Sequence, residues 1–508
     1  MKARNLFLSL FAMAAICSCN KEAEPTMDSD VLAQDTFIKV NIVAANDDTK
    51  ATDGGTEAGT AAEHEVKNVM LAFFTSSGEF VEAREYTEFE WENSSSTNVE
   101  RVSSVVVVLK GKTIVPRQVV AILNYTPAIK GAVEGAATRT HLAQLVADNP
   151  ISVIDGNNYF LMSNSVYMDG GSVNYYNQIA DSHMYTGDTP PAGYKPVDIY
   201  VERVAAKVKA SGTPAGTIKT ITLHSGDELH YYPAIEGVTL TSTANKSFLL
   251  KHLHDYTGES GWTWPFSEWN DPINRRSYWA TSYDAVSDGY TKVSYSGIGT
   301  EKEWTRYYNE NTNHANHTQL LVAASIKKAA DALTANPADP TIPDLVKFGP
   351  TYYTKDDFLT VVANEIAALG VKVGGAAFSK TNLLIAHVSG YHSKVALADA
   401  LAFDTAEMKT KAETKVADYS DLLYWKDGKS YFFTHVEHLG PDAGVNAFGI
   451  VRNHYYDIAI NSIVGLGTPV VDEAAIIEPE KPTDLDYNLA AKINILRWKV
   501  VRQTVDLN

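Results

Sequence analysis

Short segments in which apolar residues recur at every second position run through much of this chain of 508 residues. The segment Thr36–Ala44 is one example, with Ile38, Val40 and Ile42 on a single face. Successive side chains of a strand point to opposite sides of a sheet, so this period indicates a β-strand with one buried face. The 27 tyrosines favour the same class. The sequence therefore predicts an all-β protein.

The chain is long enough for two or three domains. Prolines cluster at Pro190–Pro191 and Pro196, and strand-like alternation resumes directly afterwards. We place a domain boundary near Asp198 and expect a β-sandwich on each side of it. The first would contain about seven strands.

Two helical segments are expected to interrupt the second sandwich. Thr354 is a plausible N-cap for a helix that reaches Leu369 and ends at Gly370. The other segment is Lys394–Phe403. We interpret both as insertions near residues 330–415.

The end of the chain carries a strand-like tail, Leu489–Leu507, behind the proline-bounded linker Glu478–Pro482. The tail has no Gly or Pro, and its apolar residues change parity along the way, which favours a long strand with a bend or bulge. Such a strand can fold back on its own domain or enter a neighbour's sheet. The spacing of the apolar residues does not decide between these two possibilities. The apolar positions are Ile493, Ile495, Leu496, Trp498, Val500, Val505 and Leu507.

The N-terminus reads as an export signal. Lys2 and Arg4 precede the apolar segment Leu6–Ile16, which is too short to span a membrane. The small residue Ser18 before Cys19 fits a bacterial lipobox, in which the cysteine becomes acylated after cleavage. Acyl chains on one cysteine would hold the precursor on a membrane. An ordinary signal peptide is the alternative.

Charge and a polar segment further limit the function. The net charge of −18 speaks against nucleic acid and against an anionic membrane surface as partners. After the first strand, residues 47–56 are polar and rich in glycine, and we expect them to be exposed to proteases.

Residues able to support catalysis or metal binding are scattered. No H-E-x-x-H zinc motif, phosphate loop or nucleophile elbow occurs, so we expect neither an enzyme nor a metal or other cofactor. The histidine pairs are better explained as surface or hydrogen-bonded residues: His252 and His254, His314 and His317, His387 and His392, His435 and His438. An aromatic group, Trp262, Trp264 and Trp269, can pack in a loop or bind a glycan.

Several segments together resemble the fimbrillins of Bacteroidales type V pili, and most closely their shaft subunits. The likeness extends over essentially the whole chain and is thin near residues 330–415. Its most specific part is Gly449–Ile458. The other segments are Val66–Phe74, Val119–Asn124, Leu161–Asn164, Val201–Val208 and the tail residues Leu496–Val500.

The resemblance implies a fold and an assembly mechanism. Members of this family have two transthyretin-like β-sandwich domains in tandem and are exported as lipoproteins. A trypsin-like outer-membrane protease cuts after the first strand and removes it. The C-terminal strand of another copy then fills the groove, which here would be left by Ile38, Val40 and Ile42.

The sequence departs from the family at the cleavage loop. No arginine lies between Arg4 and Arg84, although the best-known proteases of these pili are arginine-specific. Lys50 is the only basic residue of the loop, so we expect cleavage between Lys50 and Ala51.

The expected protein is a pilin of the cell surface whose partners are other copies, anchor and tip pilins and the protease. The alternatives are a tip or accessory adhesin of the same family and a monomeric surface lipoprotein. The expected division is a signal peptide (1–18), a propeptide with lipidated Cys19 and the removable strand (19–50), two sandwich domains (51–197 and 198–477), and a linker with the donor strand (478–508).

Overall fold

A computed structural model describes most of the chain. The described residues are 36–45, 59–93, 99–108, 114–165, 167–169, 172–186, 190–212, 216–252, 289–311, 316–336, 338–438, 448–479, 488–494 and 502–504. They form mainly β-sheet, so the expected all-β class is confirmed. Among them, no helix is long and apolar enough to cross a membrane.

The first half of the chain forms a ten-stranded sheet. Along its main path the strands are β3 (Phe80–Tyr86), β2 (Val69–Phe74), β6 (Gln118–Leu123), β10 (Met162–Asn164), β15 (Val197–Arg203), β1 (Thr36–Ala45), β5 (Val99–Val108) and β4 (Glu92–Asn93). Two more strands pair off this path, β13 (Asn177–Gln178) with β6 and β14 (Met184–Thr186) with β1. Strands β2 and β6 are buried at every position, because apolar clusters pack on both of their faces.

The second half contains a sandwich of two five-stranded sheets. One sheet has the order β22 (Glu303–Asn309), β16 (Ala205–Gly212), β32 (Tyr455–Val464), β34 (Asn488–Asn494) and β35 (Arg502–Thr504). The other has the order β17 (Lys219–Thr222), β18 (Glu228–Thr241), β23 (Gln319–Lys328), β31 (Lys429–His435) and β33 (Thr468–Pro469). Their inward residues share one apolar core, which includes Val208, Val322 and Ile458.

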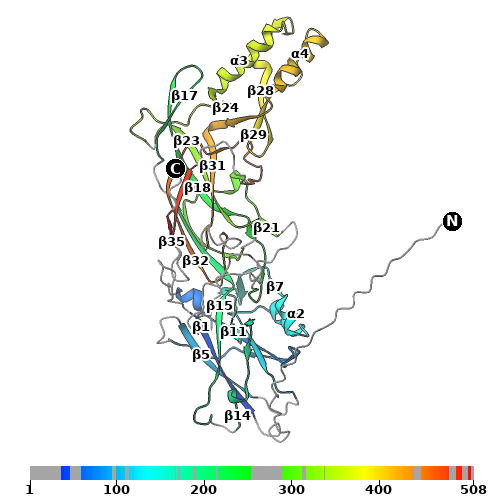
Figure 1. Ribbon diagram of the computed structural model, residues 1–508, viewed down its shortest axis with the longest axis vertical. Helices are drawn as coiled ribbons and strands as arrows, with labels where there is room; N and C mark the ends of the chain where they lie inside the picture. Colours follow the sequence, from blue (N-terminus) through cyan, green and yellow to red (C-terminus); the bar gives the residue numbers. More distant parts are fainter. Residues whose placement is uncertain are drawn as a thin grey trace, which may run out of the picture.

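A third sheet is inserted between β23 and β31. Its order is β25 (Thr351–Thr354), β24 (Leu345–Phe348), β30 (Leu422–Trp425), β29 (His392–Leu397) and β28 (Leu383–Ser389). Helices α3 (Lys355–Ala368) and α4 (Ala406–Ala417) pack against it and share its core. In Figure 1 this insertion lies at one end of an elongated molecule, and β1, β5 and β14 lie toward the other.

The remaining elements are short. They are η2 (Ala61–His64), α1 (Pro127–Glu134), α2 (Arg139–Ala143), β7 (Val146–Ala147), β8 (Ile151–Ile154), β9 (Asn157–Phe160), β11 (Tyr167–Asp169), β12 (Ser172–Asn174), η3 (Asp181–His183), β19 (Thr243–Ala244), β20 (Ser247–Phe248), β21 (Tyr290–Thr291), η6 (Tyr295–Gly297), β26 (Lys372–Val373), β27 (Ala376–Ala377), η7 (Lys380–Asn382) and η8 (Lys426–Gly428).

Two sequence predictions about the second half have different outcomes. The helix expected after Thr354 is confirmed, and the Thr354 hydroxyl accepts a hydrogen bond from the Asp357 N–H. The helix expected over Lys394–Phe403 is wrong, because residues up to Leu397 form β29 between β28 and β30. Residues 394–397 pair with β28, and this pairing overrides the helical preference of the alanine-rich segment. The second helix is α4, and it begins after Thr405.

The first sheet continues further along the chain than the expected boundary. β15 runs to Arg203 and pairs with both β1 and β10, so residues 198–203 lie in the first sheet. Val204 alone separates β15 from β16 of the second half. The division of the chain into two domains remains a prediction.

Buried ion pairs join the two halves at this point. Glu202 and Lys251 lie 2.8 Å apart with almost no solvent exposure. Glu63 lies 2.7 Å from Lys207, and its side chain also accepts a hydrogen bond from Tyr307. A buried charge is tolerated only when it is paired and hydrogen-bonded, so these contacts fix how the halves meet.

Candidate functional site

Strand β1 lies inside the first sheet, with strands on both sides. It is antiparallel to β5 from Phe37 to Ala45. On its other side it pairs with β14 over Thr36–Ile38 and then runs parallel to β15 over Val40–Ala44. In the described part of the chain, β4 and β5 reach the rest of the sheet only through β1. Removal of β1 would therefore open a slot with unpaired backbone groups on both walls.

Between its two partners on that side, β1 contacts a side chain in place of a strand. The backbone N–H of Lys39 donates a hydrogen bond to the Tyr194 hydroxyl at 2.7 Å. The same hydroxyl donates to the carbonyl of His183 at 2.8 Å. Tyr194 thus fills the break in the ladder where β14 ends and β15 begins.

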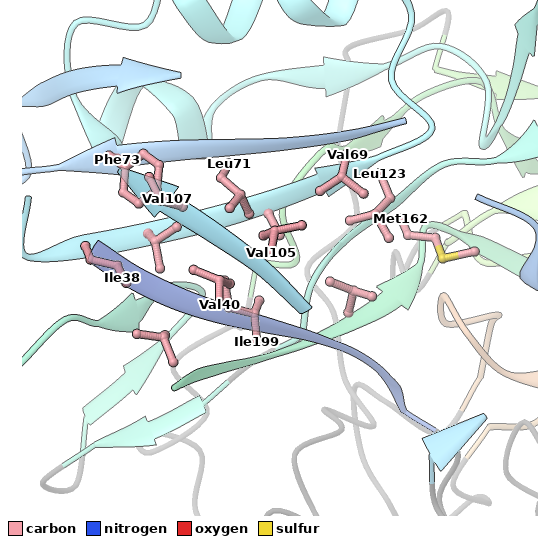
Figure 2. Packing of buried hydrophobic residues seen from close by; sticks show 14 of the residues in the cluster. Ile38, Val40, Val69, Leu71, Phe73, Val105, Val107, Leu123, Met162 and Ile199 are labelled. Carbon is pink, nitrogen blue, oxygen red and sulfur yellow. The ribbon is translucent and has the colours of Figure 1, made fainter. Parts of the chain in front are cut away.

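The inward face of β1 is part of the apolar core. Ile38 and Val40 are fully buried. In the strand register Ile38 lies opposite Val107, and Val40 lies between Val105 and Val197. Figure 2 shows Ile38 and Val40 beside these strands. Loss of β1 would expose the apolar side chains that line this row.

Ile42, the third residue predicted for this row, is described by its backbone only. It pairs with Ser103 on β5 and Ile199 on β15, both of which are buried. Its side chain lies outside the described residues, as do Cys19, Lys50 and Ala51.

The chain is anchored again soon after the predicted cleavage loop. Glu63 in η2 is buried, and its carbonyl accepts a hydrogen bond from Arg203 at 2.7 Å. Burial disfavours the charged Glu63 side chain, but hydrogen bonds from Lys207, Tyr307 and the Thr60 N–H together hold its pKa below the ordinary value. A chain cut near Lys50 would keep this anchor.

The tail pairs with its own sheet in this structure. β34 runs antiparallel to β32, so that Ile493 lies opposite Ile458. β35 returns along β34, which makes the described tail a pair of short strands and not the one long strand expected. Of the seven predicted donor residues, only Ile493 lies in a described strand. Ile495, Leu496, Trp498, Val500, Val505 and Leu507 lie outside the described residues.

The histidines that resembled metal ligands contact other side chains. His317 Nε2 and His435 Nδ1 are 2.6 Å apart, and both rings lie against Phe448. His438 Nδ1 lies 2.8 Å from the Tyr456 hydroxyl. Within the described ranges, no group of three or more His, Cys, Asp or Glu residues could hold a metal ion.

The remaining candidates have these positions. His252 stacks on Phe248, and its Nε2 contacts the carbonyl of Ala143. His387 lies 2.9 Å from the carbonyl of Gly390, and His392 lies 2.7 Å from Asp421. His254, His314, Trp262, Trp264 and Trp269 are outside the described residues.

The structure gives a role to Arg452, which lies in the Gly449–Ile458 segment. Arg452 is completely buried and forms an ion pair with Glu310. Its Nη1 donates to the carbonyl of Leu249, and its Nη2, which also contacts Glu310, donates to the carbonyl of Phe248. A lone arginine in an apolar stretch, as in Gly449–Ile458, was the only available signal, because the carboxylate partner lies 142 residues away.

Comparison with known proteins identifies the C-terminal part of the chain. The family model for the C-terminal region of fimbrillin, the major fimbrial subunit protein type IV, matches residues 423–504. Residues 423–504 are therefore similar to the C-terminal domain of fimbrillins. The matched residues begin within β30 and reach β35, so this domain includes both strands of the described tail. The fimbrillin resemblance is confirmed for this part of the chain.

Three solved structures are similar to the chain at low identity. A candidate cell adhesion protein from Parabacteroides distasonis is 14% identical with a TM-score of 0.40, covering 93% of this chain and 99% of its own. A fimbrilin from Porphyromonas gingivalis is 11% identical with a TM-score of 0.36, covering 92% and 99%. A fimbrial assembly protein from Parabacteroides distasonis is 8% identical with a TM-score of 0.33, again covering 92% and 99%. No curated protein sequence matches.

Proposed function

We propose that this chain is a structural pilin that polymerises when its C-terminal tail enters the slot left by β1 in another copy. The fimbrillin domain supports a pilin or an adhesion-related protein of the cell surface. The observation that carries the finer proposal is the interior place of β1, which is paired along both sides and buries Ile38 and Val40. An excised interior strand leaves a sheet that must be refilled.

The proposal includes how β1 is released. The precursor is held on the outer membrane by lipid on Cys19, and a trypsin-like protease cuts between Lys50 and Ala51. Residues 46–58 connect β1 to the rest of the chain, and Glu63 holds the chain just beyond them. Cleavage therefore frees β1 without freeing the remaining chain.

Assembly of this kind produces a filament. The tail of one copy and the slot of another are different surfaces, so the contact does not close on itself and can repeat. Anchor and tip pilins would end the filament, which would serve adhesion or biofilm formation.

The N-terminus of the protein on the cell surface tests this proposal. We expect mass spectrometry to find a chain that begins at Ala51. We also expect Lys50→Gln to keep β1 in place and to prevent polymers, with Lys67→Gln, beyond the loop, as the matched control. A surface protein that retains lipidated Cys19 would contradict the shaft role.

A second candidate is favoured by the pairing of β34 with β32. A tail that stays on its own sheet is what an accessory adhesin of the same pilus, or a monomeric surface lipoprotein, would have. Removal of residues 489–508 separates the two proposals, because polymer formation depends on the tail only in a shaft subunit.

A further inference from the structure

The tail repeats a short stretch of β1. Residues 39–43 read Lys-Val-Asn-Ile-Val, and residues 492–496 read Lys-Ile-Asn-Ile-Leu. Three positions are identical, and the other two exchange one aliphatic residue for another. The polar positions match as well as the apolar ones, which simple strand alternation does not require. Lys492, Ile493 and Asn494 lie in β34, so this part of the repeat is a strand in both places.

We propose that the tail enters the slot in the register that places Lys492 where Lys39 lies in the precursor. This inference rests on the proposed function and adds the alignment of the incoming strand and the residues that set it. Ile493 then takes the place of Val40, and Asn494 takes the place of Asn41.

The first support comes from Tyr194. Its hydroxyl bonds the N–H of Lys39 at 2.7 Å, at the point where neither β14 nor β15 pairs with β1. Tyr194 stays in the chain after cleavage, so an incoming strand must again present an N–H at this point. Any residue other than proline can do so, so Tyr194 supports the entry of a strand in the direction of β1, while the side chains at the neighbouring positions select Lys492 for this place.

The second support comes from the space around Val40. This side chain is fully buried between Val105 and Val197. Ile493 adds a single methylene group there. A register chosen from apolar spacing alone would place Leu496, Trp498 and Val500 at Ile38, Val40 and Ile42. An indole in the space of a valine would overpack this row, which disfavours that register.

The outward positions agree with the repeat. Lys39 lies opposite Val106 and Asn41 lies opposite Ser104, and both of these β5 residues are exposed. Polar side chains are suited to this face, and the proposed register supplies Lys492 and Asn494.

One inward position fits less well. Ala491 takes the place of Ile38, which is fully buried, so the incoming strand leaves that space partly empty. Ala491→Ile is therefore expected to make filaments more resistant to dissociation by heat or denaturant. Ala490→Ile is the matched control, because Ala490 takes the place of Phe37, one residue away from Ile38 and of opposite parity in the strand, and should give no gain. Equal effects of the two substitutions would overturn the register.

Cysteine cross-linking measures the register directly. Cys17 and Cys19 are the only cysteines, so a chain that begins at Ala51 has none. Residues directly opposite each other on paired strands are close enough for a disulfide. In the full-length, exported and assembled chain, we expect Val106→Cys with Lys492→Cys to link neighbouring subunits into a covalent ladder.

The competing register gives the opposite result. It places Arg497 opposite Val106, so Val106→Cys with Arg497→Cys should cross-link only if that register is the true one. A covalent ladder from the Arg497 pair would overturn the proposed register. So would the absence of a ladder from both pairs in filaments that still require the tail. Either result leaves the proposed function intact. Filaments that form without residues 489–508 overturn the proposed function itself.

Discussion

Single side chains of β1 can be tested in the uncleaved precursor. Ile38 is fully buried, so Ile38→Ala removes apolar contacts and leaves a cavity. We expect a loss of about 2–5 kcal/mol in the free energy of unfolding. Urea denaturation of the Lys50→Gln precursor measures this loss.

Val106 supplies the control for that experiment. It lies on the neighbouring strand β5 with 46% of its surface exposed. Val106→Ala should change the free energy of unfolding by about 0.5 kcal/mol or less. Similar losses for the two substitutions would show that β1 does not fill the core.

Glu437 should make stability depend on pH near neutrality. It is partly buried, one of its carboxylate oxygens has no hydrogen-bond partner, and burial raises its pKa to about 7. A raised carboxyl pKa means that the folded state binds a proton more tightly than the unfolded state does. Stability from this group therefore falls as pH rises from about 4.5 through 7.

Glu437→Gln removes that pH dependence. We expect a higher melting temperature than wild type at pH 8 and little difference at pH 5. Glu413→Gln is a control, because Glu413 is half exposed on α4. A pH-independent effect of Glu437→Gln would contradict this assignment.

The sequence predicted some of these residues and not others. Ile38 and Val40 were predictable because alternation within one strand marks its buried face. Tyr194 and Arg452 were not, since their partners lie 155 and 142 residues away along the chain. Spacing within a segment carries no information about contacts at such separations.

The tail is the element whose removal tests assembly. In this structure β34 pairs with β32, and β35 pairs only with β34 in the described residues. Deletion of residues 489–508 takes away an outer part of the sheet and none of its central strands. We expect both halves to stay folded and filaments to disappear.

Electron microscopy and circular dichroism check the two parts of that prediction. The control removes only Asn508, which is not one of the predicted donor residues. Normal filaments from the longer deletion would contradict it.

Strands and helices were predicted well where their own apolar pattern or N-cap determines the secondary structure. They were predicted poorly where pairing with neighbouring strands determines it. The alternation of apolar residues predicted β1, and the N-cap Thr354 predicted α3. The alanines of the segment 394–403 suit a helix, and the pairing of residues 394–397 with β28 makes that part a strand. The sequence showed that the apolar residues of the tail change parity. It did not show that the tail forms two strands, β34 and β35, that pair with each other.

The two halves of the molecule are joined by buried charges, and one of these pairs tests the joint. Lys251→Met leaves Glu202 buried without its partner. We expect a loss of about 3–5 kcal/mol in the free energy of unfolding. Denaturant titration followed by tryptophan fluorescence measures it.

A surface pair provides the comparison. Lys409 and Glu413 lie 3.7 Å apart on α4, and both side chains are more than half exposed. Lys409→Met should cost about 0.5 kcal/mol or less. Equal losses would mean that the Glu202–Lys251 pair is not structurally important.

The joint should also weaken in acid. The pKa of Glu63 is held below its ordinary value of 4.5. The stability it contributes is therefore present above pH 4.5 and is lost as pH falls through the lowered pKa. Glu63→Gln should reduce stability at pH 7 and have a smaller effect at pH 3, as a pH series of melting curves would show.

The long separation between β1 and Tyr194 has a consequence for how the chain folds. β1 is the first described strand, yet the last of its partners, β15, is translated and exported about 155 residues after it. Contacts of this kind form slowly, because a long loop must close before they add stability. Of its partners, β1 therefore has only β5 available until β14 and β15 follow, and the first sheet closes late. A pulse-labelled hydrogen-exchange experiment should find the amides of β1 protected after those of β2 and β6.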